Sequence, residues 1–131
     1  MTTYRVDETG RSAVSANPKL PKAELTLKAE KNAEEASVHC SGRINSATSD
    51  LLQETIRTLI PKTRHIVLDL SGVSYIDSSG LGAIVGVYLA VSRAGGELKV
   101  SNAQPRIREL FQITKLSAVF ENDGYRRFHY E

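Results

Sequence analysis

The chain has a single cysteine and almost no excess of charge, and each shortage excludes a class of protein. Because Cys40 has no second cysteine to pair with, no internal disulfide can form, and a reducing cytoplasm is the expected compartment. The 17 lysines and arginines are nearly balanced by 15 aspartates and glutamates. Such a balance argues against a nucleic acid or a membrane as a partner attracted by charge alone.

Long hydrophobic runs are also missing. The longest stretch without charge, residues 78–92, contains three glycines and is shorter than the roughly 18 apolar residues that indicate a transmembrane helix. It is more typical of a buried or half-buried helix. The opening residues, MTTYRVDETG, contain no apolar core of a secretion signal. We therefore expect a cytoplasmic protein without a membrane segment.

What is present fits one compact domain. The chain has 131 residues, of which 40% are hydrophobic and 24% charged, enough for a core without metal or disulfide support. Residues 1–22 are polar, lack periodicity and end in NPKLPK, so they predict a flexible N-terminal arm. The domain is expected over residues 23–121, followed by a tail or short helix at 122–131.

Hydrophobic periodicity predicts alternating strands and helices within this domain. The expected strands are 23–30, 36–42, 65–70, 97–100 and 118–121, and the expected helices are 44–62, 77–94 and 102–113. The order β-β-α-β-α-β-α-β predicts an α/β fold with a mixed, mostly parallel central sheet, to which the first hairpin adds an antiparallel edge. The run HIVLDL (65–70) is nearly all apolar, as in a central strand covered on both faces.

Few of the remaining polar residues suggest chemistry. Asp69, inside the expected central strand, is predicted to bond backbone N–H groups of the following loop, and Cys40 is predicted to be a small core residue. Arg106 and Arg108 are expected on a solvated helix face or against an acidic partner surface. No spacing of His, Cys, Asp and Glu is typical of a metal site, so no metal or other cofactor is expected.

The stretch YIDSSGLG (75–82) is the most informative in the chain, since it joins an apolar strand to a helix. In a purely structural interpretation, Ser78 or Ser79 is the N-cap residue of that helix, and Asp77 adds a favourable charge at its positive end. Gly80 and Gly82 are costly inside a helix but allow close approach of another backbone.

Three functional interpretations compete with simple capping. A hydrolase nucleophile would require G-x-S-x-G, which is absent, and a base from His39, His65 or His129. A carrier-protein attachment serine would require an all-helical domain. Regulatory phosphorylation fits an exposed serine at a helix start, because a helix N-terminus tolerates the added negative charge. Phosphorylation there would leave the fold intact and change the surface.

The helix after this junction supports a switch on binding. Gly82, Gly86 and Leu89 form a face without charge until Arg93, whereas a surface helix normally has a charged outer face. Either another part of the chain covers this face, or it is a flat docking surface beside the serines.

From His65 to Phe111 the sequence HIVLDLSGVSYIDSSGLGAIVGVYLAVSRAGGELKVSNAQPRIRELF closely resembles the STAS-domain anti-sigma factor antagonists of bacteria. The resemblance implies a non-enzymatic protein that regulates transcription indirectly. Members bind an anti-sigma factor that is also a serine kinase, are released when that kinase phosphorylates them with its own ATP, and are reset by a serine phosphatase. The implied phosphoacceptor is Ser78, with Ser79 less favoured.

The resemblance also implies a partner-binding surface, formed by the loop after the second strand and by the helix after the serines. Its residues are Asn45, Ser46, Asp77, Ser79, Gly80, Gly82, Gly86 and Leu89. The family often reads G-x-L-D in that loop, where this chain reads GRIN, so Asn45 replaces the acid. The alternative is therefore a STAS module for ligand binding or scaffolding that lacks phosphoregulation.

Overall fold

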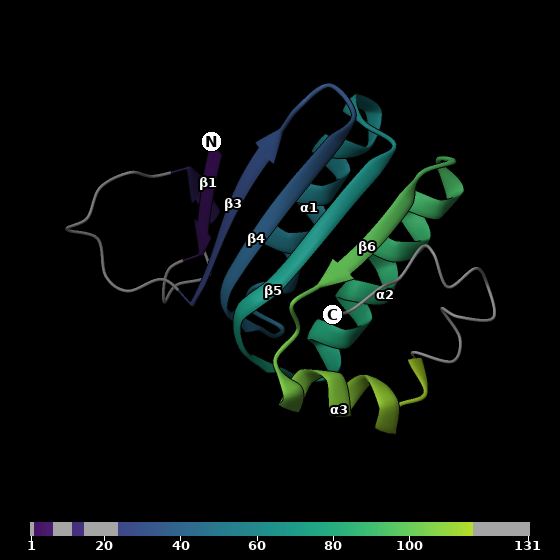
Figure 1. Ribbon diagram of the computed structural model, residues 1–131. Helices are drawn as coiled ribbons and strands as arrows, with labels where there is room; N and C mark the ends of the chain where they lie inside the picture. The colour runs from purple at the N-terminus through teal and green to yellow at the C-terminus, as the bar shows by residue number, and fades with distance from the viewer. Residues whose placement is uncertain (1, 7–11, 15–23, 117–131) are drawn as a thin grey trace.

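The computed structural model describes residues 2–6, 12–14 and 24–116, which form one sheet with helices packed on it (Figure 1). The strands are β1 (Thr2–Val6), β2 (Ser12–Val14), β3 (Leu25–Lys31), β4 (Glu35–Ile44), β5 (His65–Ile76) and β6 (Glu97–Ser101). The helices are α1 (Ser49–Leu59), the 3₁₀ helix η1 (Ile60–Lys62), α2 (Ser78–Arg93) and α3 (Pro105–Ile113).

The strands lie in the order β2-β1-β3-β4-β5-β6. β3 and β4 form an antiparallel pair, whereas β4 with β5 and β5 with β6 are parallel pairs joined through α1 and α2. The predicted α/β fold is confirmed, and so is a sheet that is mostly parallel among β3 to β6. The predicted order is confirmed from β3 to α3. The last expected strand, 118–121, and the tail, 122–131, lie outside the described residues.

β1 and β2 fall within residues 1–22, where the polar sequence led us to expect a flexible arm without strands. β1 pairs antiparallel with β3, with Thr2 opposite Ala29 and Val6 opposite Leu25. The reason is general: a strand at the edge of a sheet has unpaired backbone donors and acceptors, and β3 presents them to any segment within reach. The structure thus adds β1 and β2 to the predicted strands, whereas the flexible arm and the domain boundary at residue 23 stay predictions.

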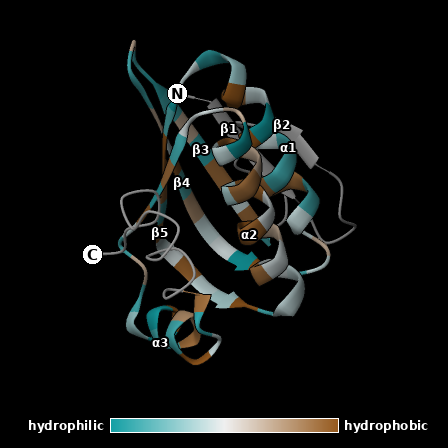
Figure 2. Cartoon of the chain, turned by 90° about the vertical axis from the view of Figure 1, so that its right-hand side faces the viewer, coloured by the Kyte–Doolittle hydropathy of each residue, from teal (hydrophilic) through white to brown (hydrophobic). Residues whose placement is uncertain are grey.

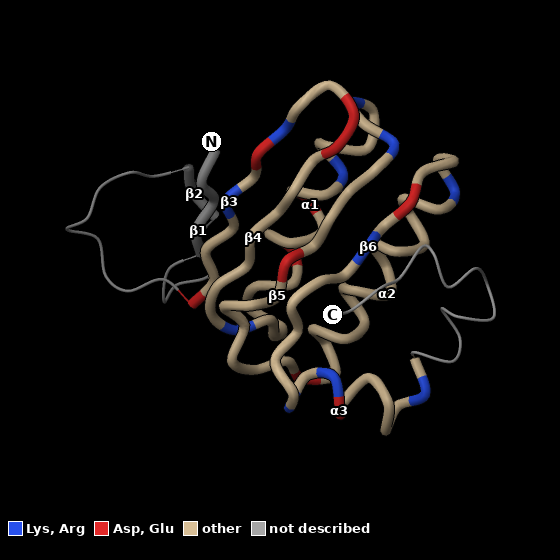
Figure 3. Tube along the Cα trace, in the orientation of Figure 1, with Lys and Arg blue, Asp and Glu red and all other residues tan. Residues whose placement is uncertain are grey.

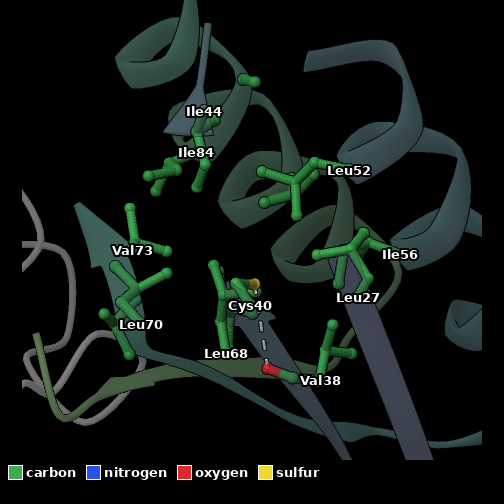
Figure 4. Packing of buried hydrophobic residues seen from close by; sticks show 14 of the residues in the cluster. Leu27, Val38, Cys40, Ile44, Leu52, Ile56, Leu68, Leu70, Val73 and Ile84 are labelled. Carbon is green, nitrogen blue, oxygen red and sulfur yellow. Dashed lines mark hydrogen bonds between the residues drawn. The ribbon is translucent and has the colours of Figure 1, made fainter. Parts of the chain in front are cut away.

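The hydrophobic core lies between the sheet and the helices α1 and α2, which cover one face of it (Figures 1 and 2). Alternate residues of each strand point to this face. Figure 4 shows side chains from β4, β5 and α1 meeting there, among them Val38, Cys40, Leu68 and Leu52. Cys40 is the core residue that the sequence predicted, and burial raises the pKa of its thiol.

β5 was expected to be covered on both faces, and this is wrong within the described residues: α1 and α2 cover only one face of the strand. Ile66, Leu68 and Leu70 are buried beneath α1 and α2, whereas Val67 and Asp69 on the other face are only half-buried. The run HIVLDL looked continuous because Val67 is apolar, but the neighbours of Val67 on that face are polar.

β5 is also longer than predicted, and this extension positions the site. Residues 71–76 contain serines and a glycine and were expected to form a loop, but they continue the pairing with β4. At the end of the pair, Tyr75 lies opposite Arg43 and Ile76 opposite Ile44. The ends of β4 and β5 are therefore side by side where α2 begins.

Candidate functional site

The start of α2 and the end of β4 are in direct contact. The backbone N–H of Asp77 donates a hydrogen bond to the carbonyl oxygen of Ile44 at 3.2 Å. Three residues later, Gly80 packs so closely on the same carbonyl that a Cβ atom at Gly80 would overlap it. Gly80 thus permits the close backbone approach that its position suggested.

Asp77 is the N-cap residue of α2. Its backbone is extended, and its side-chain Oδ1 accepts a hydrogen bond from the Gly80 N–H at 2.9 Å. The expectation that Ser78 or Ser79 is the cap is wrong, because the aspartate one residue earlier satisfies the free N–H instead. The two serines become the first two residues of the helix.

Ser78 and Ser79 are both exposed, and within the described part of the chain neither hydroxyl has a hydrogen-bond partner. The positions i, i+4, i+7 and i+11 share one face of a helix, so Ser78 lies in line with Gly82, Val85 and Leu89. We call these four residues the Ser78 face. Ser79 is turned by about 100° from this line.

The Ser78 face is open to solvent over most of its length. Gly82 is exposed with no atom within 4 Å of an added Cβ, and Leu89 is 39% exposed. Gly86 lies at the border with α1, where an added Cβ would be 3.6 Å from the Gln53 side chain. Of the predicted docking residues on α2, the structure brings Gly82 and Leu89 in line with Ser78, and Gly86 lies partly against α1.

Asn45 opens the loop between β4 and α1, and its side chain holds the loop together. Its Oδ1 accepts a hydrogen bond from the Ala47 N–H at 3.0 Å, and its own N–H donates to Thr48 Oγ1 at 2.9 Å. The buried Thr48 hydroxyl donates in turn to the Arg43 carbonyl oxygen at 2.9 Å. Asn45 follows Ile44 directly, so the loop lies beside the start of α2, with Ser46 exposed.

A second polar cluster lies on the sheet face that points away from α1 and α2. His39 Nδ1 is 2.8 Å from Asp69 Oδ2, and the Ser71 N–H donates to Asp69 Oδ1 at 2.9 Å. Burial alone would raise the pKa of Asp69, but hydrogen bonds from Ser71, His39 and Asn102 outweigh it and hold the pKa below its usual value. Asp69 thus binds the backbone N–H of the segment after it, as predicted.

Neither of the two described histidines lies beside Ser78, where it could act as a base. His39 is on the opposite face of the sheet, and His65 begins β5, whereas Ser78 follows its far end. His129 lies outside the described residues. No group of three or more metal-ligating side chains gathers within the residues described, and none of the helices there is long and apolar enough to cross a membrane.

One surface feature was not predicted from the sequence. A groove of about 410 Å³ lies between the end of β5 and α3; its lining residues are Tyr75, Ile76, Arg106, Ile107, Glu109, Leu110 and Ile113. We call it the β5–α3 groove. The only sequence signal was an aromatic residue in a segment that was expected to be a loop.

Fold and site together define a small α/β protein that presents an exposed serine pair at a capped helix start. The comparisons with known proteins agree, since the STAS domain family matches residues 26–129. The chain belongs to the STAS domain family.

Two similar proteins are named as anti-sigma factor antagonists, one a curated protein and the other a solved structure. The anti-sigma-B factor antagonist of Bacillus subtilis is 31% identical over 97 residues, which is 74% of this chain and 89% of that protein. The crystal structure of an anti-sigma factor antagonist from Mycobacterium paratuberculosis superposes with a TM-score of 0.64 at 25% identity, covering 72% of this chain and 81% of the other.

A third similarity concerns the fold alone. The structure of the Bacillus cell fate determinant SpoIIAA in its phosphorylated form has a TM-score of 0.60 at 19% identity and covers 80% of this chain and 90% of that one. The mixed sheet with its packed helices is therefore the fold of the family.

Proposed function

We propose that this chain is an anti-sigma factor antagonist that regulates transcription indirectly. Unphosphorylated, it binds an anti-sigma factor serine kinase in the cytoplasm. The kinase transfers the γ-phosphoryl group of its own ATP to the Ser78 oxygen, the hydroxyl proton is lost, and ADP leaves. The phosphorylated chain is released, and a serine phosphatase restores the hydroxyl. The chain itself supplies no catalysis.

The exposed, unpartnered Ser78 hydroxyl in line with an uncharged helix face is the observation that carries this proposal. Because Asp77 caps the helix, Ser78 is not needed for capping and is free to react. A phosphate on Ser78 would place about −1.5 to −2 charges at one end of the Ser78 face, which has none of its own. Burying that charge against a partner is costly, so release follows. The two curated or solved relatives with antagonist names support the same function.

The direct test incubates the purified chain with ATP and each anti-sigma factor encoded in its source genome, followed by peptide mass spectrometry. We expect one phosphate on Ser78, none on the Ser78→Ala variant, and unchanged labelling of Ser79→Ala as the matched control. Ser78→Asp is expected to bind the same kinase more weakly. Absence of phosphate from Ser78 together with full binding by Ser78→Asp would contradict the proposal.

One observation favours a second candidate, a STAS module for ligand binding or scaffolding without phosphoregulation. Asn45 stands where the resemblance places an acid, and its side chain is already bonded within its own loop. If an aspartate at this position is required to contact the kinase, this chain lacks that charge-assisted bond. Indifference of both the natural chain and Asn45→Asp to every anti-sigma factor tested would favour this candidate.

A further inference from the structure

The β5–α3 groove has exposed apolar side chains in its walls. Three large hydrophobic side chains are exposed in the described part of the chain, namely Tyr75 at 45%, Leu89 at 39% and Ile113 at 69%. Tyr75 at the end of β5 and Ile113 at the end of α3 both line the groove, together with the half-buried Leu110. Figure 2 shows hydrophobic colour on α3 at this end of the molecule. Clustered exposed apolar side chains indicate an interaction site.

The groove suits a protein side chain better than a small ligand. Pockets for small molecules bury most of the ligand surface. Here Tyr75 and Ile113 in the walls are themselves exposed, so a bound small molecule would stay in contact with water. A protein surface that covers the whole groove would exclude water from both walls, as at the centre of a protein interface.

Two arginines lie at the groove. The Arg43 guanidinium lies 5.4 Å from the centre of the Tyr75 ring, and Arg106 lines the groove itself. Neither arginine has an ion-pair partner among the described residues, whereas the lining contains one acid, Glu109. Figure 3 shows basic and acidic positions next to each other on α3. Two unpaired arginines favour an acidic partner segment.

The groove is also continuous with the proposed modification site. Tyr75 and Ile76 form one wall, and Asp77 and Ser78 follow them in the chain. α3 contacts β5, the strand whose end leads into α2 (Figure 1). A partner that covers Ser78 therefore meets the edge of the groove without crossing another element.

Resting on the proposed function, we propose that the β5–α3 groove is a second docking point for the anti-sigma factor. It receives an apolar side chain of that protein, and a carboxylate of the same segment pairs with Arg106 or Arg43. The groove contributes affinity but carries no phosphate, so it acts in both states of Ser78 and helps to determine which anti-sigma factor is bound.

The test measures the dissociation constant of the anti-sigma factor that phosphorylates Ser78, by calorimetry with the full chain and its variants. Ile113→Asp is expected to weaken binding at least tenfold, because it puts a charge into the apolar contact. Gln112→Asp adds the same charge on an exposed neighbour of the same helix outside the groove, and is expected to change binding less than twofold. Arg106→Gln is expected to slow association and to reduce its dependence on salt.

Other results would overturn the groove inference, alone or together with the proposed function. If Ser78→Asp weakens binding but Ile113→Asp and Arg106→Gln do not, the proposed function holds and the groove inference is overturned. If no anti-sigma factor binds the unmodified chain, the proposed function has failed, and the groove inference fails with it. If Ile113→Asp abolishes self-association in sedimentation without changing partner binding, the groove holds a second copy of the chain. If it exposes residues 117–131 to protease without changing partner binding, the groove holds the chain's own C-terminal segment. Either result overturns the inference.

Discussion

The backbone of Gly80 rests directly on the carbonyl group of Ile44, at the point where the end of β4 meets the first turn of α2. The same carbonyl accepts the Asp77 N–H, so one oxygen joins the β4–α1 loop to the start of the serine-bearing helix. The position of Ser78 relative to Asn45 therefore depends on a glycine that neither of them contacts through its side chain.

Replacing that glycine should separate the two segments. Gly80→Ala forces the Cβ into the Ile44 carbonyl, and overpacking of this kind costs about 1–3 kcal/mol of unfolding free energy. Gly82→Ala, two residues later, meets open space and should stabilise α2 by about 0.5–1 kcal/mol, since alanine is the better helix former. Urea denaturation of both variants measures the difference. Equal midpoints would mean that the contact at Gly80 is not structural.

The cap of α2 should depend on the Asp77 side chain and not on the serines. Asp77→Ala removes the acceptor for the Gly80 N–H and should cost about 0.5–2 kcal/mol, while Asp77→Asn keeps an oxygen in the same place and should cost little. Ser78→Ala and Ser79→Ala should leave the free energy of unfolding within about 0.5 kcal/mol of the natural chain, as for surface substitutions away from special features. A larger loss in Ser79→Ala than in Asp77→Ala would restore the serine as the cap.

The serine junction shows how far the sequence could predict the site. The change from an apolar strand to a helical pattern located the junction. The missing charges on α2 marked one face of the helix but left open whether that face is covered or exposed. Which side chain caps the helix was not decidable, because Asp77, Ser78 and Ser79 are all good caps and the choice depends on the backbone angles at one residue.

The groove shows what sequence patterns could not reach. It depends on residues 71–76 being strand instead of loop, and serine and glycine there lower the strand signal. Pairing with β4 overrides that local preference, and only the pairing brings Tyr75 next to α3. The edge contact of β1 was missed for a similar reason, since it is made by backbone groups that every sequence has.

Asp69 should make stability depend on pH in the acid range. Its folded-state pKa lies below the ordinary 3.8, so its ionised form stabilises the fold above that pH, and the contribution is lost as the pH falls through the folded-state pKa. Asp69→Asn should cost about 1.5–3 kcal/mol at neutral pH, a typical value for hydrogen bonds to a charged group. The deficit should be constant from about pH 7 to about pH 5 and should shrink below about pH 4. Urea unfolding at several pH values tests this, and a deficit that grew on acidification would be the opposite of the expected sign.

Asn45→Asp separates the role of the side chain in the loop from its role in binding. A carboxylate oxygen can accept the Ala47 N–H as the amide oxygen does, so the variant should unfold within about 0.5 kcal/mol of the natural chain. Asn45→Ala loses that bond and should be less stable by about 1 kcal/mol. If Asn45→Asp binds the anti-sigma factor more tightly while its stability is unchanged, the acid acts on the partner. Equal stability of Asn45→Ala would show that the loop does not need the side chain.

The attachment of the β4–α1 loop to α2 has a consequence for how long a signal lasts. The Ile44 carbonyl accepts the Asp77 N–H and the Asp77 side chain caps α2, so the serine-bearing turn is bonded both to the end of β4 and within itself. Under the proposed function, the record of phosphorylation is held in one covalent bond and in no slow rearrangement of the chain. The lifetime of the signal is then the lifetime of that phosphoester, which the phosphatase alone determines.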